Sequence, residues 1–346
     1  MAHEFIQRGY GKQISWSKHL WLDMWGVWDS GWYMDIAQNG YSIESSITNS
    51  PQTNFPFFPL YPMAMKLLGQ LTGGEYFLAG IFISNVCLLL SGYLLYKLVL
   101  EDAGQQTALR TVKYLFIYPV SFILSGIFTE SLYLFLTLLC FYMARHRRWW
   151  PAGIVGAFLS ATRTLGVLIL LPLAFEYFQS IRFKLRKINL SILFLLLVPL
   201  GLLSFSLYNY LTTGDFLYFK TNQAAWGRAM MNPLLTLPLA VKTGLINQNI
   251  KLLTEASFCA GALFLLNVFY KKIGFTYWLF GMYSLVIPLA AGIYSMPRFT
   301  LPIFPLFILL AKLGEDDFWD STLTLWFGLL QGGLMIFWCT GQSLIV

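Results

Sequence analysis

The stretch FLAGIFISNVCLLLSGYLLYKLVL, residues 77–100, carries a single charged side chain, Lys97, in an otherwise mostly apolar run. A helix rises about 1.5 Å per residue, so this length crosses the roughly 30 Å of hydrocarbon in a bilayer. Four further stretches share its apolar character: 189–211, 252–270, 273–294 and 321–346. The sequence therefore predicts an all-α fold, a polytopic bundle of transmembrane helices.

The composition of the whole chain supports this fold. Of its 346 residues, 57% are hydrophobic and 11% are charged, whereas a soluble domain carries roughly 25% charged residues. We expect one integral membrane domain over residues 1–346. Its predicted parts are an external loop at 1–57, an interfacial helix at 58–72, and transmembrane helices over 77–346 with a second external loop at 212–250.

The basic residues predict which ends of the spans face the cytoplasm. They form clusters between apolar runs: Lys97, Arg110 and Lys113; Arg145, Arg147 and Arg148; Arg182, Lys184, Arg186 and Lys187; Lys271 and Lys272. Lys and Arg favour cytoplasmic loops, so the net charge of +7 gives no reason to expect nucleic acid. Between these clusters lie shorter, marginal spans at 114–128, 131–144, 151–162 and 165–177, with another at 299–311. If the clusters share one side, Glu130 and Arg163 lie at the tips of helical hairpins on the other side.

The cysteine and histidine residues predict no metal site and no cofactor. The four cysteines each lie inside an apolar stretch without C-x-x-C spacing, and the three histidines are scattered along the chain. Structural zinc sites need four such ligands close together. We therefore interpret the cysteines as packing residues that face lipid or the protein core.

Two acids on the predicted external side are candidates for chemistry. Asp29 follows Trp28 and precedes a short helix predicted to end at Gly40, so a helix-capping role is the alternative. Glu130 lies at a hairpin tip, where an intramembrane acid is by default a functional hypothesis, again with capping as the alternative.

Three arginines are predicted to converge on the same side: Arg163 at the second hairpin tip, Arg228 in the second external loop, and Arg298 before a Pro-rich apolar run. Arg163 and Arg298 could instead extend their guanidinium groups to the membrane interface. Acids and arginines gathered on one side favour a site for a sugar phosphate, because guanidinium groups bind phosphate oxygens in pairs.

The order of several motifs resembles one known family. Residues 28–41 begin with Trp28-Asp29 and end with Gly40-Tyr41, and Phe57-Phe58-Pro59-Leu60-Tyr61-Pro62 follows. Both are similar to segments of the PIG-V-like mannosyltransferases of the GT-C superfamily. Later matches, which resemble particularly the bacterial members, are Phe128-Thr129-Glu130-Ser131-Leu132, Thr162-Arg163-Thr164-Leu165-Gly166, Gly214-Asp215-Phe216 and Ala225-Trp226-Gly227-Arg228. Pro297-Arg298-Phe299 completes the series.

This resemblance implies a GT-C fold whose first external loop bears two membrane-parallel helices and the catalytic carboxylate. It implies a membrane mannosyltransferase that takes a sugar from a polyprenyl-phosphate donor and passes it to an unknown glycan or lipid acceptor. We expect transfer with inversion on the non-cytoplasmic side, in a bacterial plasma membrane or alternatively the endoplasmic reticulum. The expected roles are catalysis by Asp29 and Glu130, donor-phosphate binding by Arg298, Arg163 and Arg228, and substrate positioning by Trp28, Asp35 and Trp226.

One departure from the family leaves alternatives open. Members normally have a transmembrane helix before the Trp-Asp motif, whereas residues 1–27 are interrupted by Arg8, Lys12, Lys18 and Asp23. Either translation begins further upstream or the tail is translocated without its own anchor. A lipid or solute transporter and a non-catalytic subunit of a transferase complex are the alternatives to an enzyme.

Overall fold

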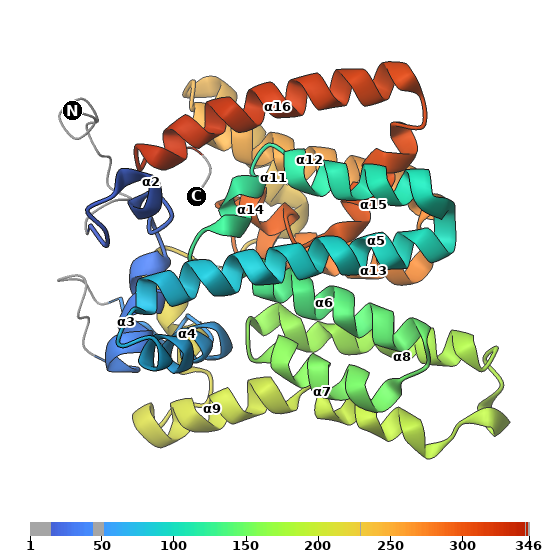
Figure 1. Cartoon of the computed structure of the whole chain (residues 1–346), viewed down its shortest axis with the longest axis horizontal. Coiled ribbons are helices and arrows are strands. Elements are labelled where there is room, and N and C mark those ends of the chain that lie inside the picture. The colour runs from blue at the N-terminus through green and yellow to red at the C-terminus, as the bar shows by residue number, and fades with distance from the viewer. Residues whose placement is uncertain (1–14, 44–51, 229, 343, 345–346) are drawn as a thin grey trace.

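The computed structural model describes residues 15–43, 52–228, 230–342 and 344, and Figure 1 shows them as a bundle of helices. Within these ranges the chain contains no β-strand. Four helices are long and apolar enough to cross a membrane: Tyr76–Ile117, Leu190–Thr213, Ile250–Val268 and Asp317–Cys339. The prediction of an all-α membrane protein is confirmed.

The α-helices are α2 (Leu20–Asp23), α3 (Ser30–Asn39), α4 (Leu60–Leu71), α5 (Tyr76–Ile117), α6 (Glu130–Arg145), α7 (Trp149–Ser160), α8 (Leu170–Ser180), α9 (Leu200–Thr213), α10 (Tyr218–Thr221), α11 (Pro233–Ile246), α12 (Ile250–Val268), α13 (Gly274–Leu289), α14 (Met296–Thr300), α15 (Phe304–Leu313) and α16 (Asp317–Cys339). Short 3-10 helices connect them: η1 (Ser121–Ser125), η2 (Thr164–Ile169), η3 (Leu185–Lys187), η4 (Leu190–Leu197), η5 (Asn222–Trp226) and η6 (Tyr270–Lys272).

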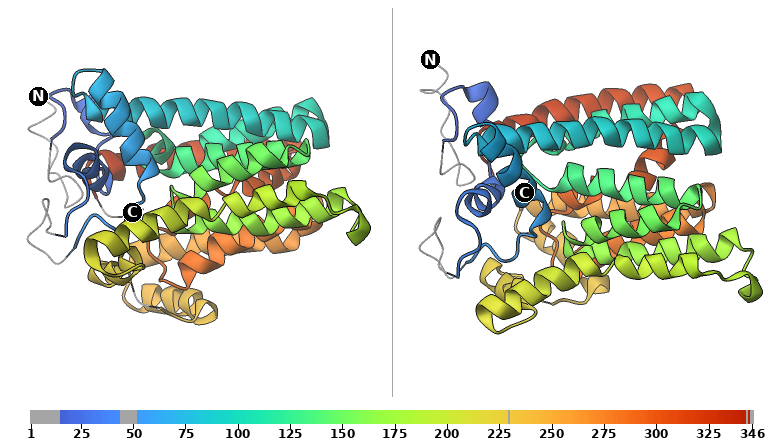
Figure 2. Two further views of the ribbon diagram at one scale, coloured as in Figure 1. Left: turned by 90° about the horizontal axis from the view of Figure 1, so that it is seen from below. Right: turned by 60° about the horizontal axis from the view of Figure 1, so that its bottom comes forward.

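The helices α2, α3 and α4 lie together at one end of the bundle, as both views in Figure 2 show. The ring of Tyr33 on α3 meets the ring of Tyr61 on α4 edge-on at 5.3 Å. The Tyr61 hydroxyl donates to the Gly80 carbonyl of α5 at 3.0 Å. Exposed Met63 and Leu67 on α4 fit the predicted position at the membrane interface. These contacts fix the short helices of the first loop on the start of α5.

The long helix α5 is a hairpin of two arms. Its continuity breaks at Gly104, whose φ of +79° lies in the left-handed region that glycine adopts without a steric penalty. The arms then pack side by side, since a methyl group at Gly92 would lie 3.2 Å from the Phe116 ring. The chain therefore returns toward the α3 and α4 end, where η1 leads to Glu130 (Figure 1).

Helices α7 and α9 approach each other closely through glycine. A methyl group added at Gly201 would lie 2.1 Å from the Ala157 carbonyl oxygen. The Ser160 hydroxyl donates to the Val198 carbonyl at 2.6 Å across the same contact. In a membrane, where lipid is as apolar as the side chains, such backbone contacts and hydrogen bonds replace the hydrophobic effect as the main attraction between helices.

The predicted external loop at 212–250 contains the helices α10, η5 and α11, which the sequence did not indicate. The helix α11 starts with Pro233 and is capped by the Asn232 side chain, which accepts from the Leu234 N–H at 3.0 Å. It extends about 21 Å at 1.5 Å per residue, too short to cross the bilayer unaided. Because α11 is short and contains Pro238, its sequence does not match the pattern of a transmembrane helix.

The last helix, α16, lies along the outside of the bundle at the top of Figure 1 and is mostly exposed. Lys113 pairs with its Asp320 at 2.6 Å near one end. At the other end the Trp338 indole N–H donates to the Met24 carbonyl at 2.9 Å, and its ring lies 5.4 Å from that of Phe128. The far end of α16 therefore contacts two segments that lead to the candidate acids Asp29 and Glu130.

Candidate active site

Asp29 lies directly before α3, at the position from which an aspartate usually caps a helix. Its side chain makes no capping hydrogen bond there. Instead, Arg298 Nη1 donates to Asp29 Oδ2 at 2.5 Å. The structure thus rejects the capping role and joins two residues that are 269 positions apart.

Glu130 is the first residue of α6, and its side chain is fully buried. Its Oε1 lies 2.5 Å from Arg163 Nη2 and 2.8 Å from Arg298 Nε, the second being an ion pair without a well-aligned hydrogen bond. Removing one partner from a buried pair of this kind typically costs about 3–5 kcal/mol, because a charge is left uncompensated. Glu130 therefore holds both arginines. Asp29, Glu130, Arg163 and Arg298 are called the ion-paired cluster below.

Arg163 lies between α7 and η2, where the hairpin tip was predicted. Its Nε donates to Thr129 Oγ1 at 2.9 Å, and that oxygen lies 3.4 Å from the Tyr33 hydroxyl. Burial, followed by the charge of Glu130, raises the pKa of Tyr33 well above its ordinary value. The phenol is therefore neutral at physiological pH and remains a hydrogen-bond donor beside the cluster.

Arg298 lies on α14 and is buried, with 8% of its side chain exposed. An arginine that extends to the interface would expose its guanidinium group, so this alternative is wrong for Arg298. Burial lowers the pKa of Arg298, but the charges of Glu130 and Asp29 outweigh burial and leave it above its ordinary value. The guanidinium group is held as a cation by both acids.

Arg228 lies beside the ion-paired cluster and has no carboxylate partner among the residues that the structure describes. Its guanidinium carbon is 5.6 Å from the centre of the Phe299 ring, which Arg163 and Arg298 also approach, at 5.7 and 5.9 Å. Burial and then the nearby Arg298 lower the pKa of Arg228. A bound anion would relieve both effects, which makes Arg228 the uncommitted cation of the site.

Trp28 Nε1 and Glu130 Oε2 are buried polar atoms without a hydrogen-bond partner among the described residues, and Arg298 Nε has only its ion pair with Glu130. A buried group left without a partner typically costs about 1–3 kcal/mol. Trp28 also has a φ of +54°, which is unusual for a bulky residue and places strain at this position. The unpaired donor of Trp28, which directly precedes Asp29 in the chain, and the unpaired acceptor of Glu130 fit the hydroxyl groups of a substrate.

The family described as "Mannosyltransferase (PIG-V)" matches residues 12–309, which is most of the chain and includes every residue of the ion-paired cluster. The chain belongs to the PIG-V mannosyltransferase family. A mouse protein named "GPI alpha-1,6-mannosyltransferase 2" is 29% identical to it over 156 residues, covering 41% of this chain and 29% of the mouse protein. The chain is therefore similar to less than a third of that relative's length.

Not all predicted positioning residues of this PIG-V family member join the cluster. Asp35 on α3 accepts hydrogen bonds from Asn39 Nδ2 at 2.9 Å and from Asn54 Nδ2 at 2.8 Å. Its carboxylate thus links α3 to the segment before α4 and makes no ion pair with the cluster arginines. Residues 1–14 and 44–51 of the first loop and the side chain of Trp226 lie outside the described part of the chain, so the predicted role of Trp226 stays a prediction.

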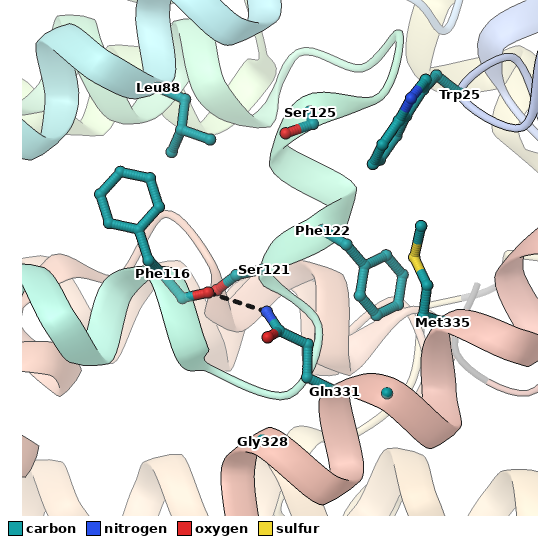
Figure 3. Close-up of a pocket in the computed structure, with 10 residues that line it drawn as sticks. Trp25, Leu88, Phe116, Ser121, Phe122, Ser125, Gly328, Gln331 and Met335 are labelled. Carbon is teal, nitrogen blue, oxygen red and sulfur yellow. Dashed lines mark hydrogen bonds between the residues drawn. The ribbon is translucent and has the colours of Figure 1, made fainter. Parts of the chain in front are cut away.

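One cavity of this PIG-V family member lies apart from the residues of the cluster. It measures about 470 Å³ and lies between α5, η1 and α16, where Trp25, Phe116 and Met335 contribute to its lining (Figure 3). Gln331 Nε2 donates to the Phe116 carbonyl at 2.9 Å within it. Its lining contains no charged residue, so it does not offer groups that could catalyse transfer.

Glu255 on α12 is a residue near the site that the sequence reading missed. It is fully buried and accepts hydrogen bonds from the first residues of α14. The sequence does point to Glu255, because an acid within an otherwise apolar span is a functional hypothesis by default. No comparable signal identified Tyr33, one of several aromatic residues in the first loop.

Proposed function

We propose that this chain transfers a mannosyl group from a polyprenyl-phosphate donor to a hydroxyl group of a glycan or lipid acceptor. The transfer inverts the anomeric carbon and takes place on the non-cytoplasmic side of a bacterial plasma membrane. Membership of a mannosyltransferase family supports the choice of sugar. The single observation that carries the proposal is the ion-paired cluster, with Arg228 beside it as a cation that has no described carboxylate partner.

Asp29 suits the role of general base because substrate can reach it. Its side chain keeps 22% of its surface exposed and pairs with one arginine, whereas Glu130 Oε1 pairs with both Arg163 and Arg298. In the proposed step Asp29 removes the proton of the acceptor hydroxyl while that oxygen forms a bond to the anomeric carbon. The bond between this carbon and the phosphate oxygen breaks on the opposite face, and its electron pair leaves with the polyprenyl phosphate.

The arginines stabilise the phosphate that departs. Two acids and two guanidinium groups make the ion-paired cluster neutral, so Arg228 contributes an additional positive charge beside it. A sugar phosphodiester carries one negative charge, which this cation would balance. In this proposal Arg228 makes the first contact with the donor phosphate, while Arg298 and Arg163 support it from the cluster.

Glu130 and Trp28 are proposed to orient the sugars. Glu130 Oε1 holds Arg163 and Arg298, and its unpaired Oε2 can accept from a sugar hydroxyl. Trp28 Nε1 can donate to another hydroxyl oxygen. In the absence of substrate these two atoms have no described partner, so binding would satisfy them without breaking an existing hydrogen bond.

The proposal is tested by assaying the purified chain with a panel of polyprenyl-phosphate sugars. We expect transfer from the mannosyl donor, and a loss of about 10²- to 10⁴-fold in Asp29→Asn, which cannot accept the proton. Asp317→Asn is the matched control, because Asp317 is exposed at the start of α16. Full activity of Asp29→Asn would overturn the assignment of the base. If the wild-type chain transfers no sugar but takes up the donor, a transporter is supported. If transfer occurs only when the chain is part of a complex, a non-catalytic subunit is supported.

A further inference from the structure

Glu255 is an acid inside the apolar helix α12, and both of its carboxylate oxygens point at the backbone of another element. Oε1 accepts from the Ser295 N–H at 3.0 Å, and Oε2 accepts from the Met296 N–H at 2.6 Å. These two groups open α14. Glu255 therefore acts as a capping residue supplied by a different helix, and it satisfies two donors that would otherwise be orphaned.

The element that it caps cannot form by itself. The helix α14 spans Met296–Thr300, a length for which helix formation in isolation is unfavourable. Its preceding residue, Ser295, has a φ of +66°, a left-handed conformation that costs a non-glycine residue about 1–2 kcal/mol. Contacts with other elements must therefore hold this backbone in place. Glu255 provides two of them, because it accepts hydrogen bonds from the N–H groups of the strained Ser295 and of the neighbouring Met296.

Arg298 follows Met296 by two positions on this short helix. Its guanidinium group meets Asp29 and Glu130 at 2.5 and 2.8 Å, so a small shift of α14 would separate all three groups. We propose that Glu255 is a positioning residue: by anchoring the start of α14 to α12, it sets where the Arg298 guanidinium group lies against the two carboxylates. This inference rests on the proposed function for its catalytic consequence.

The test combines Glu255→Gln with Arg298→Lys in a double-mutant cycle. Glutamine keeps one acceptor oxygen but turns an NH₂ group toward the other backbone N–H, so one hydrogen bond is lost. Because a displacement of about 1 Å can cost about 100-fold in rate, we expect Glu255→Gln to lower kcat by about 10- to 100-fold. The double variant should be no slower than Arg298→Lys alone, because both changes act through the same guanidinium group. Losses that multiply fully would overturn the inference.

A second readout does not depend on activity. Hydrogen exchange of the Ser295 and Met296 amides, followed on the intact protein, should be slow in the wild type and faster in Glu255→Gln. Equal exchange in both proteins would overturn the proposed anchor, even if the wild-type chain transfers no sugar and the proposed function fails. Glu255→Asp retains both oxygens on a shorter side chain and should recover part of the rate and of the protection. Glu315→Gln, at an exposed position, is the control.

Discussion

Arg298 shows what a single residue contributes here, since one guanidinium group contacts two carboxylates that come from different parts of the chain. The fixed, planar fork of arginine makes this double contact possible, whereas the ammonium group of lysine is a point charge. Fixing three charged partners before substrate arrives reduces the reorganisation needed during transfer. At the residue scale, the candidate site therefore depends on the fixed orientation of a few charged side chains.

Arg228 is the residue whose removal should affect donor binding most selectively. Burial and the neighbouring Arg298 lower its pKa, and an anionic phosphate would reverse this effect. We expect Arg228→Ala to raise the KM for the donor by about 10- to 100-fold, because a charge-assisted hydrogen bond contributes about 1.5–3 kcal/mol. Initial rates over a range of donor concentrations measure this effect. Lys220→Ala, an exposed change on α10, is the control; an unchanged KM in Arg228→Ala would assign the phosphate to other groups.

The residues of the ion-paired cluster were singled out by the sequence, but their pairing was not. Asp29, Glu130, Arg163 and Arg298 stood out as charged groups beside apolar runs, and motif order linked them to a family. Which acid meets which arginine depends on how α3, α6 and α14 pack, and hydropathy contains no information on that packing. The capping alternative for Asp29 was locally sound, yet the contact with Arg298 prevailed because a buried guanidinium group requires a counter-charge.

At the scale of elements, glycines let pairs of helices meet at backbone distance. The contact of Gly201 on α9 with Ala157 on α7 leaves no room for a side chain. Gly153 on α7 meets the Phe194 carbonyl of η4 in the same way, where a methyl group would lie 2.0 Å from the oxygen. These contacts join α7 to the span formed by η4 and α9.

A single methyl group should therefore disturb this packing. Gly201→Ala would bring a carbon atom to 2.1 Å from the Ala157 oxygen, so we expect a loss of about 1–3 kcal/mol of stability and a lower Tm in detergent. Gly261→Ala on α12 is the matched control, because nothing lies within 4 Å of its added methyl group. Because alanine has a higher helix propensity than glycine, Gly261→Ala should not lower the Tm. Thermal unfolding of both variants tests this; equal Tm values would contradict the close contact.

The elements followed from the sequence wherever a segment was long and uniformly apolar. The spans at 77–100, 189–211, 252–270 and 321–346 correspond to helices of the structure. The helix α11 was missed, since its 14 residues match no transmembrane length. The sharp reversal at Gly104 has a left-handed glycine as its cause, but glycines are frequent in this chain and a sequence does not reveal which one breaks a helix.

At the scale of the whole molecule, the two ends of the bundle differ in chemistry. The ion-paired cluster adjoins α3 at one end, and the basic turn around η3 lies at the opposite end in Figure 2. Cytoplasmic loops are enriched in Lys and Arg. We therefore expect the cluster to face away from the cytoplasm.

Cysteine labelling in intact cells tests this orientation. Lys18→Cys and Lys184→Cys place thiols at exposed positions near opposite ends. A membrane-impermeant reagent should label position 18 in intact cells and position 184 only after the membrane is opened. The wild-type chain is the control, because three of its four cysteines are buried and the fourth is partly buried. Labelling of both positions from outside, or the reverse order, would contradict the predicted sidedness.

The contacts of α16 connect a helix that faces the bilayer to the segments that carry Asp29 and Glu130. Trp338 is bonded to Met24 and packs on Phe128, five residues before Asp29 and two before Glu130. The rest of α16 is mostly exposed, and a loosely packed helix tilts to match the thickness of the hydrocarbon around it. We therefore expect turnover to vary with acyl-chain length in reconstituted vesicles, because lipid composition would change how Asp29 and Glu130 align with the arginines.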